Sequence, residues 1–324
     1  MTTPAQTSAP TPAPAPAPAA APPFGLLLDV DGPVASPVTR TVSAPGLLGS
    51  LRELLAAGVP VVFNTGRSDR FLRENVLAPL LREGLPPGAR LHAVCEKGAV
   101  HFSVGPDGPG PLHVDTGVAV PEPVVAALEE LARRDFAETM FVDPGKHAMV
   151  SIEQRLDVPS AAYLAAQERF DAAAVEVLAG AGLGVEHRGG RRPDAAGRVD
   201  WRVDPTIIST DVESVLLGKD RGADTALRLL AADGPLPRAW RTAGDSRTDY
   251  AMADRLHELG HDVAHVDVRP ADGVRARPYP VLLAERTVND AAGAAWLARV
   301  AAVVRGEAAD DTGFDASPAG HPAA

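Results

Sequence analysis

Short apolar runs alternate with amphipathic segments along most of this chain, and this alternation is the strongest constraint on its fold. The runs have the length of buried strands, and they lie at residues 26–28, 61–63, 91–95, 263–268 and 281–284. The segments between them carry leucines and other apolar residues at helical spacing. Strands that alternate with helices form a parallel sheet flanked by helices. The pattern therefore predicts a Rossmann-like, doubly wound α/β core.

Residues 98–213 interrupt this alternation. Their pattern predicts a strand, a helix at 122–136, a hairpin around "DPGK", a helix at 160–179 and a hairpin around "RGGRRPDAAGR". A helix followed by two strands, repeated once, describes an α+β module. We therefore expect a core formed by residues 23–97 and 214–305, with residues 98–213 inserted into it as a second domain.

The two ends of the chain have a different composition. Residues 1–22 repeat Ala, Pro and Thr, whereas residues 306–324 are small, polar and without a pattern. Neither stretch has enough large apolar residues to build a core. We expect both to be disordered tails.

Charge and cysteine content exclude several classes of partner. The formal net charge of −11 argues against a nucleic-acid or anionic-membrane surface, because both need a clustered positive field. Cys95 is the only cysteine, which excludes an internal disulfide and fits a reducing, cytoplasmic setting. No stretch of about 18 apolar residues could span a bilayer, and the N-terminus lacks the pattern of a secretory signal. We expect no nucleic acid, no membrane and no export; the sequence carries no signal for an oligomeric state.

The first apolar run leads directly into two aspartates, in "LLLDVDGPV" at residues 26–34. Ligands of open parallel sheets bind beyond the carboxyl ends of the strands, which is where Asp29 and Asp31 are expected. Two carboxylates on one face of a strand repel each other unless a cation compensates, and Mg²⁺ prefers such oxygen ligands. A plain turn after the strand is the alternative, and Asp-x-Asp also occurs in metal-dependent glycosyltransferases.

Three further segments carry candidate site residues, each just after a predicted strand. In "VVFNTGR", Thr65 and the amide of Gly66 could donate hydrogen bonds to an anion. Lys219 is one of three lysines against 28 arginines, and a compact ammonium fits between a phosphate and a carboxylate where a guanidinium does not. In "GDSRTD", a helix that starts near Ser246 would bring Asp245 and Asp249 to one metal ion. The alternatives are a common loop at Thr65 and Gly66, a merely solvated side chain for Lys219, and an ordinary helix cap for Asp245.

In this order, with the insertion between the second and third segments, these segments resemble the haloacid dehalogenase superfamily of phosphatases. "DVDG" is similar to the first motif of that superfamily, Thr65 in "TGR" to the second, Lys219 to the third and "GDSRTD" to the fourth. The inserted domain is similar to a cap of the C2 class, type B. The resemblance covers nearly all of residues 24–305. It implies a Mg²⁺-dependent phosphomonoesterase that acts on a small phosphorylated metabolite, first of all a sugar phosphate.

The resemblance also implies roles for individual residues. Asp29 would be the nucleophile that forms an aspartyl-phosphate, and Asp31 would act first as acid and then as base. Thr65 and Lys219 would hold the phosphoryl oxygens. The groups that bind Mg²⁺ or orient its water would be Asp29, Asp31, Asp245 and Asp249.

Candidate substrate contacts are Gly66 and Arg67 in the core, Lys97 at the entry to the cap, and Arg191 and Arg192 in a basic cap loop. This chain departs from the family pattern in two places. Pro33 follows "DVDG" where threonine is usual, and Lys97 lies in "CEKGAV" where Asn-Gly-Ala is common.

Two other functions remain open from the sequence. A phosphotransferase or mutase of the same superfamily would pass the phosphoryl group to a sugar, although Thr-Gly-Arg favours hydrolysis. A non-catalytic, metabolite-sensing protein would be expected to have lost Asp29, Asp31 or Lys219, and all three are present. The stretch "HELGH" matches a zinc-site pattern, but Gly260 is expected to end the helix between its two histidines.

Overall fold

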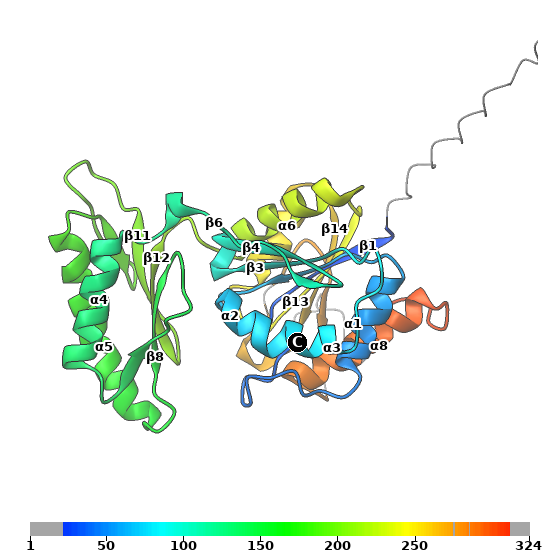
Figure 1. Ribbon diagram of the computed structural model, residues 1–324, viewed down its shortest axis with the longest axis horizontal. Helices are drawn as coiled ribbons and strands as arrows, with labels where there is room; N and C mark the ends of the chain where they lie inside the picture. The colour runs from blue at the N-terminus through cyan, green and yellow to red at the C-terminus, as the bar shows by residue number, and fades with distance from the viewer. Residues whose placement is uncertain (1–21, 275, 285, 312–324) are drawn as a thin grey trace, which may run out of the picture.

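The computed structural model describes residues 22–311, apart from 275 and 285. It contains two β-sheets that lie side by side, each with its own helices (Figure 1). We call the parts around the nine-stranded and six-stranded sheets the core and the cap. This confirms the predicted α/β core with an inserted α+β domain. The predicted N-terminal tail lies outside the described residues except for Pro22, and of the predicted C-terminal tail only 306–311 are described.

Six adjacent strands of the core sheet run parallel, in the order β15-β14-β13-β1-β2-β3. Their bounds are β1 (Phe24–Leu28), β2 (Val61–Asn64), β3 (Leu91–Cys95), β13 (Ala239–Gly244), β14 (Asp262–Asp267) and β15 (Val281–Leu283). All five apolar runs of the sequence form strands of this sheet. The strand β13 was not among them, because Arg241 interrupts its apolar residues.

Helices cover both faces of the core sheet, as the doubly wound pattern predicts. In β1, Leu26 and Leu28 pack on one face with α1 and α8, whereas Leu27 packs on the other with α6 and α7. The bounds are α1 (Leu47–Ala56), α6 (Lys219–Asp233), α7 (Tyr250–Glu258) and α8 (Asn289–Val304). A continuous helical segment on the α1 side comprises α2 (Asp69–Leu72), a π-helical turn (Arg73–Leu77) and α3 (Ala78–Arg82). Single 3₁₀ turns lie at Glu96–Gly98, Thr116–Val118 and Pro270–Asp272.

The cap has a sheet in the order β10-β9-β11-β12-β8-β7, with two helices packed against it (Figure 1). Its elements are α4 (Glu122–Asp135), β7 (Met140–Val142), β8 (Val150–Gln154), α5 (Ser160–Gly180), β9 (Val185–His187), β10 (Gly190–Arg192), β11 (Trp201–Pro205) and β12 (Ser209–Ser214). Apolar side chains from both helices and the sheet form a separate hydrophobic cluster. Among the described residues, no helix is both long and apolar enough to cross a bilayer.

The structure corrects the expected start of the cap. Residues 98–118 do not contribute strands to the cap sheet. Instead β4 (Val100–Gly105) pairs antiparallel with β3, and β5 (Gly108–Pro109) and β6 (His113–Val114) pair with β4. The reason is a reversal of the chain at Gly98, whose φ of 103° suits glycine, followed by Val100 and Phe102, which the core buries.

Two helical glycines on the same side of the core sheet give a paired test of this packing. A Cβ on Gly293 of α8 would lie 1.9 Å from the carbonyl oxygen of Pro33, whereas a Cβ on Gly49 of α1 would meet nothing within 4 Å. We expect Gly49→Ala to raise the free energy of unfolding by about 0.5–1 kcal/mol, because alanine favours a helix. Gly293→Ala should lower it by about 1–3 kcal/mol, because α8 must move away from the loop after Asp31. Urea denaturation measures the free energy of unfolding of both variants. An equal rise in the two variants would contradict the close contact of Gly293 with Pro33.

Candidate active site

Lys219, the first residue of α6, lies among groups from three neighbouring strand ends. Its ammonium is 2.6 Å from Oδ1 of Asp29, 2.7 Å from Oδ1 of Asp249 and 2.7 Å from the carbonyl oxygen of Asn64. Asp29 follows β1, and its N–H donates to the carbonyl of Ala243 in β13, which continues the pairing of the two strands. All these residues are buried. The structure thus brings three of the candidate residues together: Asp29, Lys219 and Asp249.

The electrostatics of this group are strongly coupled. Burial and the nearby Asp249 raise the pKa of Asp29 well above its usual value, against the opposing effect of Lys219. Burial alone would raise the pKa of Asp249 too, but Lys219 and a hydrogen bond from Ser246 hold it below its usual value. The two carboxylates raise the pKa of Lys219 despite its burial. One ammonium therefore stabilises two buried carboxylates, and Asp249 is the more firmly ionised of the two.

Asp245 completes a set of oxygen ligands. Asp29, Asp245 and Asp249 each offer a carboxylate oxygen, and these three atoms lie within 4.8 Å of one another. Burial and the neighbouring Asp249 raise the pKa of Asp245 to about 6, although Arg269 opposes this shift from 3.1 Å. Such a largely buried, mutually repelling set of carboxylates fits a hard divalent cation, and Mg²⁺ is the ion of that kind that commonly binds beside phosphate.

Two glycines allow these carboxylates to approach the strand ends. A Cβ on Gly32 would lie 2.5 Å from Cβ of Asp245, and one on Gly244 would lie 2.2 Å from Cβ of Asp249.

The position of Asp249 corrects one expectation: α7 begins at Tyr250, four residues later than Ser246. The preceding turn is closed by Oδ2 of Asp249, which accepts from the N–H groups of Asp245 and Ser246 at 3.1 and 2.9 Å.

Asp31 lies next to this group but has a different partner. Nε and a terminal nitrogen of Arg67 donate to its two carboxylate oxygens at 2.9 and 3.0 Å. The other terminal nitrogen of Arg67 is 3.5 Å from Glu153, a buried residue of β8 in the cap. Glu153 also receives a hydrogen bond from Arg40 at 3.4 Å. Arg67 therefore links the second aspartate of "DVDG" to the cap.

Thr65 and Gly66 form the loop after β2, next to Asn64. Thr65 is fully buried, and its hydroxyl accepts from the N–H of Arg67 at 3.1 Å. The carbonyl of Gly66 accepts from Nζ of Lys146, at 2.6 Å, which reaches the core from the "DPGK" hairpin of the cap. The hairpin thus lies directly against the loop that the sequence predicts to bind an anion.

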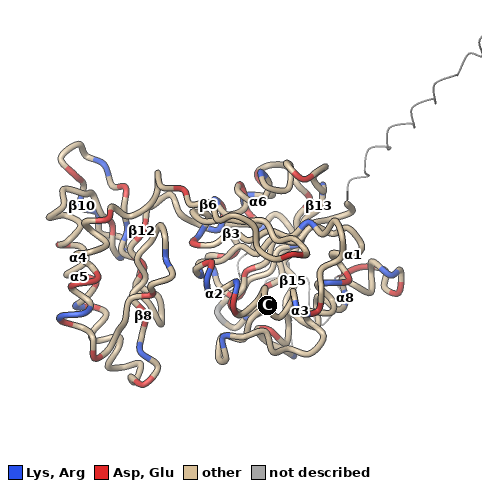
Figure 2. The backbone as a smooth tube through the Cα atoms, viewed as in Figure 1, with Lys and Arg blue, Asp and Glu red and all other residues tan. Residues whose placement is uncertain are grey.

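A cleft of about 870 Å³ runs between the core and the cap. Both Lys219 and Lys97 line it from the core, and Arg191 lines it from the cap. Arg192 is not brought to this cleft; it pairs with Glu176 of α5 at 2.8 Å, because successive residues of β10 point to opposite faces. Along the backbone of both the core and the cap, positions of lysine and arginine are interspersed with positions of aspartate and glutamate (Figure 2).

Acidic residues of the cap face the core, and the sequence patterns considered above do not predict them. In β12, Asp211 and Glu213 lie on the face of the cap sheet that meets Lys97, whereas Val212 belongs to the hydrophobic cluster. Their alternation in "STDVES" is the signal that could have identified them, because residues two apart share a face of a strand. Glu153 follows the same rule in β8, two residues after Ser151.

The histidines of "HELGH" do not form a metal site in the described structure. Helix α7 ends at Glu258, and the ring of His257 packs near Tyr279 whereas that of His261 packs near Trp240. Among the residues that the structure describes, the aspartate trio is the one group of three or more candidate ligands that meets the geometry of a metal site.

The structure is similar to those of known hydrolases. No family model matches the chain by sequence, and no curated protein matches it. A haloacid dehalogenase-like hydrolase from Bacteroides thetaiotaomicron matches with a TM-score of 0.53 and 15% identity, over 87% of this chain and 98% of the other. The sucrose-phosphatase from Synechocystis, in complex with sucrose and phosphate, matches with a TM-score of 0.50, also at 15% identity and over 87% and 98% of the two chains. The chain therefore has a haloacid dehalogenase-like fold.

The buried ammonium of Lys219 gives a test that does not depend on activity. Lys219→Met leaves Asp29 and Asp249 buried without a counter-charge, so we expect a loss of about 3–5 kcal/mol of unfolding free energy in EDTA. Added Mg²⁺ should restore part of it, because the ion binds the folded state. Lys146→Met is the matched control: it removes one partly exposed hydrogen bond and should cost at most about 1.5 kcal/mol. Chemical denaturation of both variants provides the measurement, and equal losses would contradict the pairing.

Proposed function

We propose that this chain is a Mg²⁺-dependent phosphomonoesterase of the haloacid dehalogenase superfamily that hydrolyses a small phosphorylated metabolite. The observation that carries the proposal is the buried contact of Lys219 with Asp29 and Asp249, beside Asp245, at the carboxyl ends of parallel strands. Ligands of open α/β sheets bind at this edge. The haloacid dehalogenase-like fold supports the proposal, but the chemistry is argued from the site itself.

Asp29 is the proposed nucleophile. Its carboxylate oxygen attacks phosphorus, the bond from phosphorus to the ester oxygen breaks, and an aspartyl-phosphate forms. Water then attacks the same phosphorus, the bond to Asp29 breaks, and inorganic phosphate is released. The first step requires an ionised carboxylate, and Lys219 at 2.6 Å favours that form. Its ammonium and the loop of Thr65 and Gly66 are the proposed contacts of the phosphoryl oxygens.

Asp31 is the proposed proton donor to the leaving oxygen and the proton acceptor from water in the second step. In the present arrangement Arg67 binds both of its oxygens. Each of these oxygens keeps a second lone pair, so Asp31 can approach the leaving group while Arg67 holds it in place.

Mg²⁺ would be held by Asp29, Asp245 and the main chain of Asp31, with Asp249 orienting its water. When bound, it neutralises charge so that an anionic nucleophile can approach an anionic phosphate. The carboxylates favour such a cation, since the pKa values of Asp29 and Asp245 are raised even with Lys219 and Arg269 beside them.

The cleft supports a small metabolite as the substrate. Its volume of about 870 Å³ is within the usual range for small-molecule sites, and both cations and carboxylates line it. Such a lining suits a polyhydroxylated leaving group, whose hydroxyls donate to carboxylates and accept from cations. The Synechocystis neighbour is a sucrose-phosphatase, so sugar phosphates are the first substrates to test.

Phosphate release from a panel of phosphorylated metabolites tests the proposal. We expect hydrolysis with Mg²⁺, loss of it in EDTA, and poor replacement by Ca²⁺, whose looser coordination disturbs the approach to phosphorus. Asp29→Asn should abolish turnover, and Asp31→Asn should slow both half-reactions. Asp107→Asn, in an exposed turn between β4 and β5, is the control and should behave like the wild type. Turnover of Asp29→Asn above a few per cent, in a preparation free of other phosphatases, would refute the covalent mechanism.

The two arginines of β10 test the position of the leaving group. Arg191 lines the cleft, whereas Arg192 pairs with α5. We expect Arg191→Ala to raise KM for the metabolite several-fold, which corresponds to a loss of about 1 kcal/mol or more of binding free energy. KM for p-nitrophenyl phosphate should not change. Arg192→Ala should leave both substrates unaffected. Equal effects of the two variants would show that the cleft does not hold the leaving group at this end.

A further inference from the structure

Glu96 and Lys97 follow β3 in an unusual backbone conformation. Their φ angles are 48° and 53°, in the left-handed region that residues with side chains seldom adopt. Such conformations persist where the surrounding structure holds them in place. The contacts of this dipeptide therefore indicate what it does.

The main chain of the dipeptide joins two core segments that carry proposed phosphate-binding groups. The N–H of Glu96 donates to the carbonyl of Arg67 at 3.1 Å, and the N–H of Lys97 donates to that of Thr65 at 3.0 Å. The carbonyl of Lys97 accepts from the N–H of Gly218, the residue before α6, at 2.9 Å. The loop after β2 and the start of α6 are thus fixed to the same two residues.

The side chain of Glu96 extends from this junction to the cap. Its carboxylate is fully buried and accepts the N–H groups of His147, Ala148 and Met149 at 2.9, 2.8 and 3.2 Å. These three residues follow the "DPGK" turn and lead into β8. A buried carboxylate thereby fixes the main chain of the cap hairpin to the end of β3.

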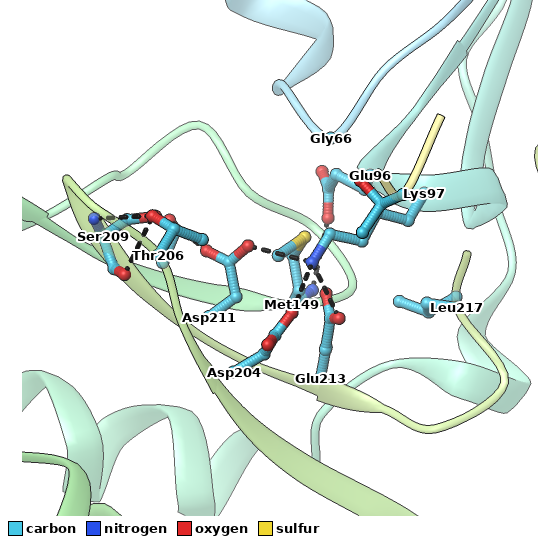
Figure 3. Close-up of polar contacts among 12 residues, drawn as sticks. Gly66, Glu96, Lys97, Met149, Asp204, Thr206, Ser209, Asp211, Glu213 and Leu217 are labelled. Carbon is cyan, nitrogen blue, oxygen red and sulfur yellow. Dashed lines mark hydrogen bonds and ion pairs between the residues drawn. The ribbon is translucent and has the colours of Figure 1, made fainter. Parts of the chain in front are cut away.

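The side chain of Lys97 contacts the cap sheet (Figure 3). Its ammonium lies 2.8 Å from Glu213, 3.1 Å from Asp211 and 3.5 Å from Asp204. Burial disfavours its charge, yet these carboxylates raise the pKa of Lys97 above its usual value. Arg202 also pairs with Glu213, so two cations meet three carboxylates and the cluster carries no surplus positive charge. A phosphoryl group would be repelled here.

We propose that Lys97 is a positioning residue that, together with Glu96, fixes the cap against the phosphate-binding loop and does not bind the phosphoryl group. Without the ammonium, Asp211 would be a buried carboxylate without a cation at its side, Glu213 would keep only Arg202, and the cap sheet would lose the attachment that Lys97 provides. This role differs from the substrate contact expected from the sequence. It concerns the free protein, so its test does not require phosphatase activity.

Hydrogen–deuterium exchange of the full chain in EDTA tests the proposal with two variants. Lys97→Met keeps the length of the side chain without its charge, and Lys97→Gly also suits the left-handed backbone. In both we expect the amides of residues 147–149 and of β12 to exchange about tenfold faster or more than in the wild type. Arg255→Met is the matched control: it removes a cation that pairs with Asp224, another residue of the core. Exchange in the cap should not change.

Titration with inorganic phosphate in the presence of Mg²⁺ separates positioning from direct binding. We expect Lys97→Met to bind phosphate within about threefold of the wild type, because its ammonium faces the cap carboxylates. Exchange at residues 147–149 that matches the wild type in both variants, or a larger loss of phosphate affinity, would overturn the proposal. If the wild type itself binds no phosphate, the proposed function fails, and the exchange measurement still decides the role of Lys97.

Discussion

The contact of Lys219 with Asp29 and Asp249 is the interaction on which the rest of the site depends. Two buried carboxylates and the partly exposed Asp245 cannot all stay ionised at one place without positive charge, and Lys219 supplies one such charge from the first residue of α6. The parallel sheet makes the contact possible. Because β1 pairs with β13 in the register Leu28↔Ala243, the segments that follow both strands leave the sheet at the same edge, where α6 begins. A slip of one residue would turn Asp29 to the opposite face.

The cap contributes to this site through the division of its sheet into two faces. One face packs its apolar residues against α4 and α5, and the other presents acidic residues to the core. Glu153 of the cap contacts Arg67, which holds Asp31. Glu213 of the cap contacts Lys97, whose N–H donates a hydrogen bond to the carbonyl of Thr65. The position of the cap is therefore coupled to the loops that carry the proposed catalytic groups. Closure of such a domain would also exclude water from the phosphoryl group.

Local sequence patterns predicted most of the core and failed where a local pattern had two readings. The five apolar runs became strands of the core sheet, because they are short and a strand covered on both faces is apolar on both. The strand at Val100–Gly105 lies in the core sheet and not in the cap as predicted, since its alternation of buried and more exposed residues suits a strand of either sheet. The apolar pattern does not predict β13, because Arg241 interrupts its apolar residues; the guanidinium of Arg241 pairs with Asp311.

The sequence by itself determined which residues could form the site. Asp29 follows β1, and Asp245 and Asp249 follow β13, and the ends of these adjacent parallel strands must meet. Lys219 follows β12 of the cap sheet instead, so its place beside them was decided by the position of α6 on the core. The rarity of lysine likewise marked Lys97, but its partners were decided only by the tertiary structure. Asp211 and Glu213 lie 114 and 116 residues further along the chain, and they reach Lys97 because the cap folds back over the core. Periodicity encodes which face a side chain occupies, whereas the charge that it meets across an interface depends on how two separately folded units pack together.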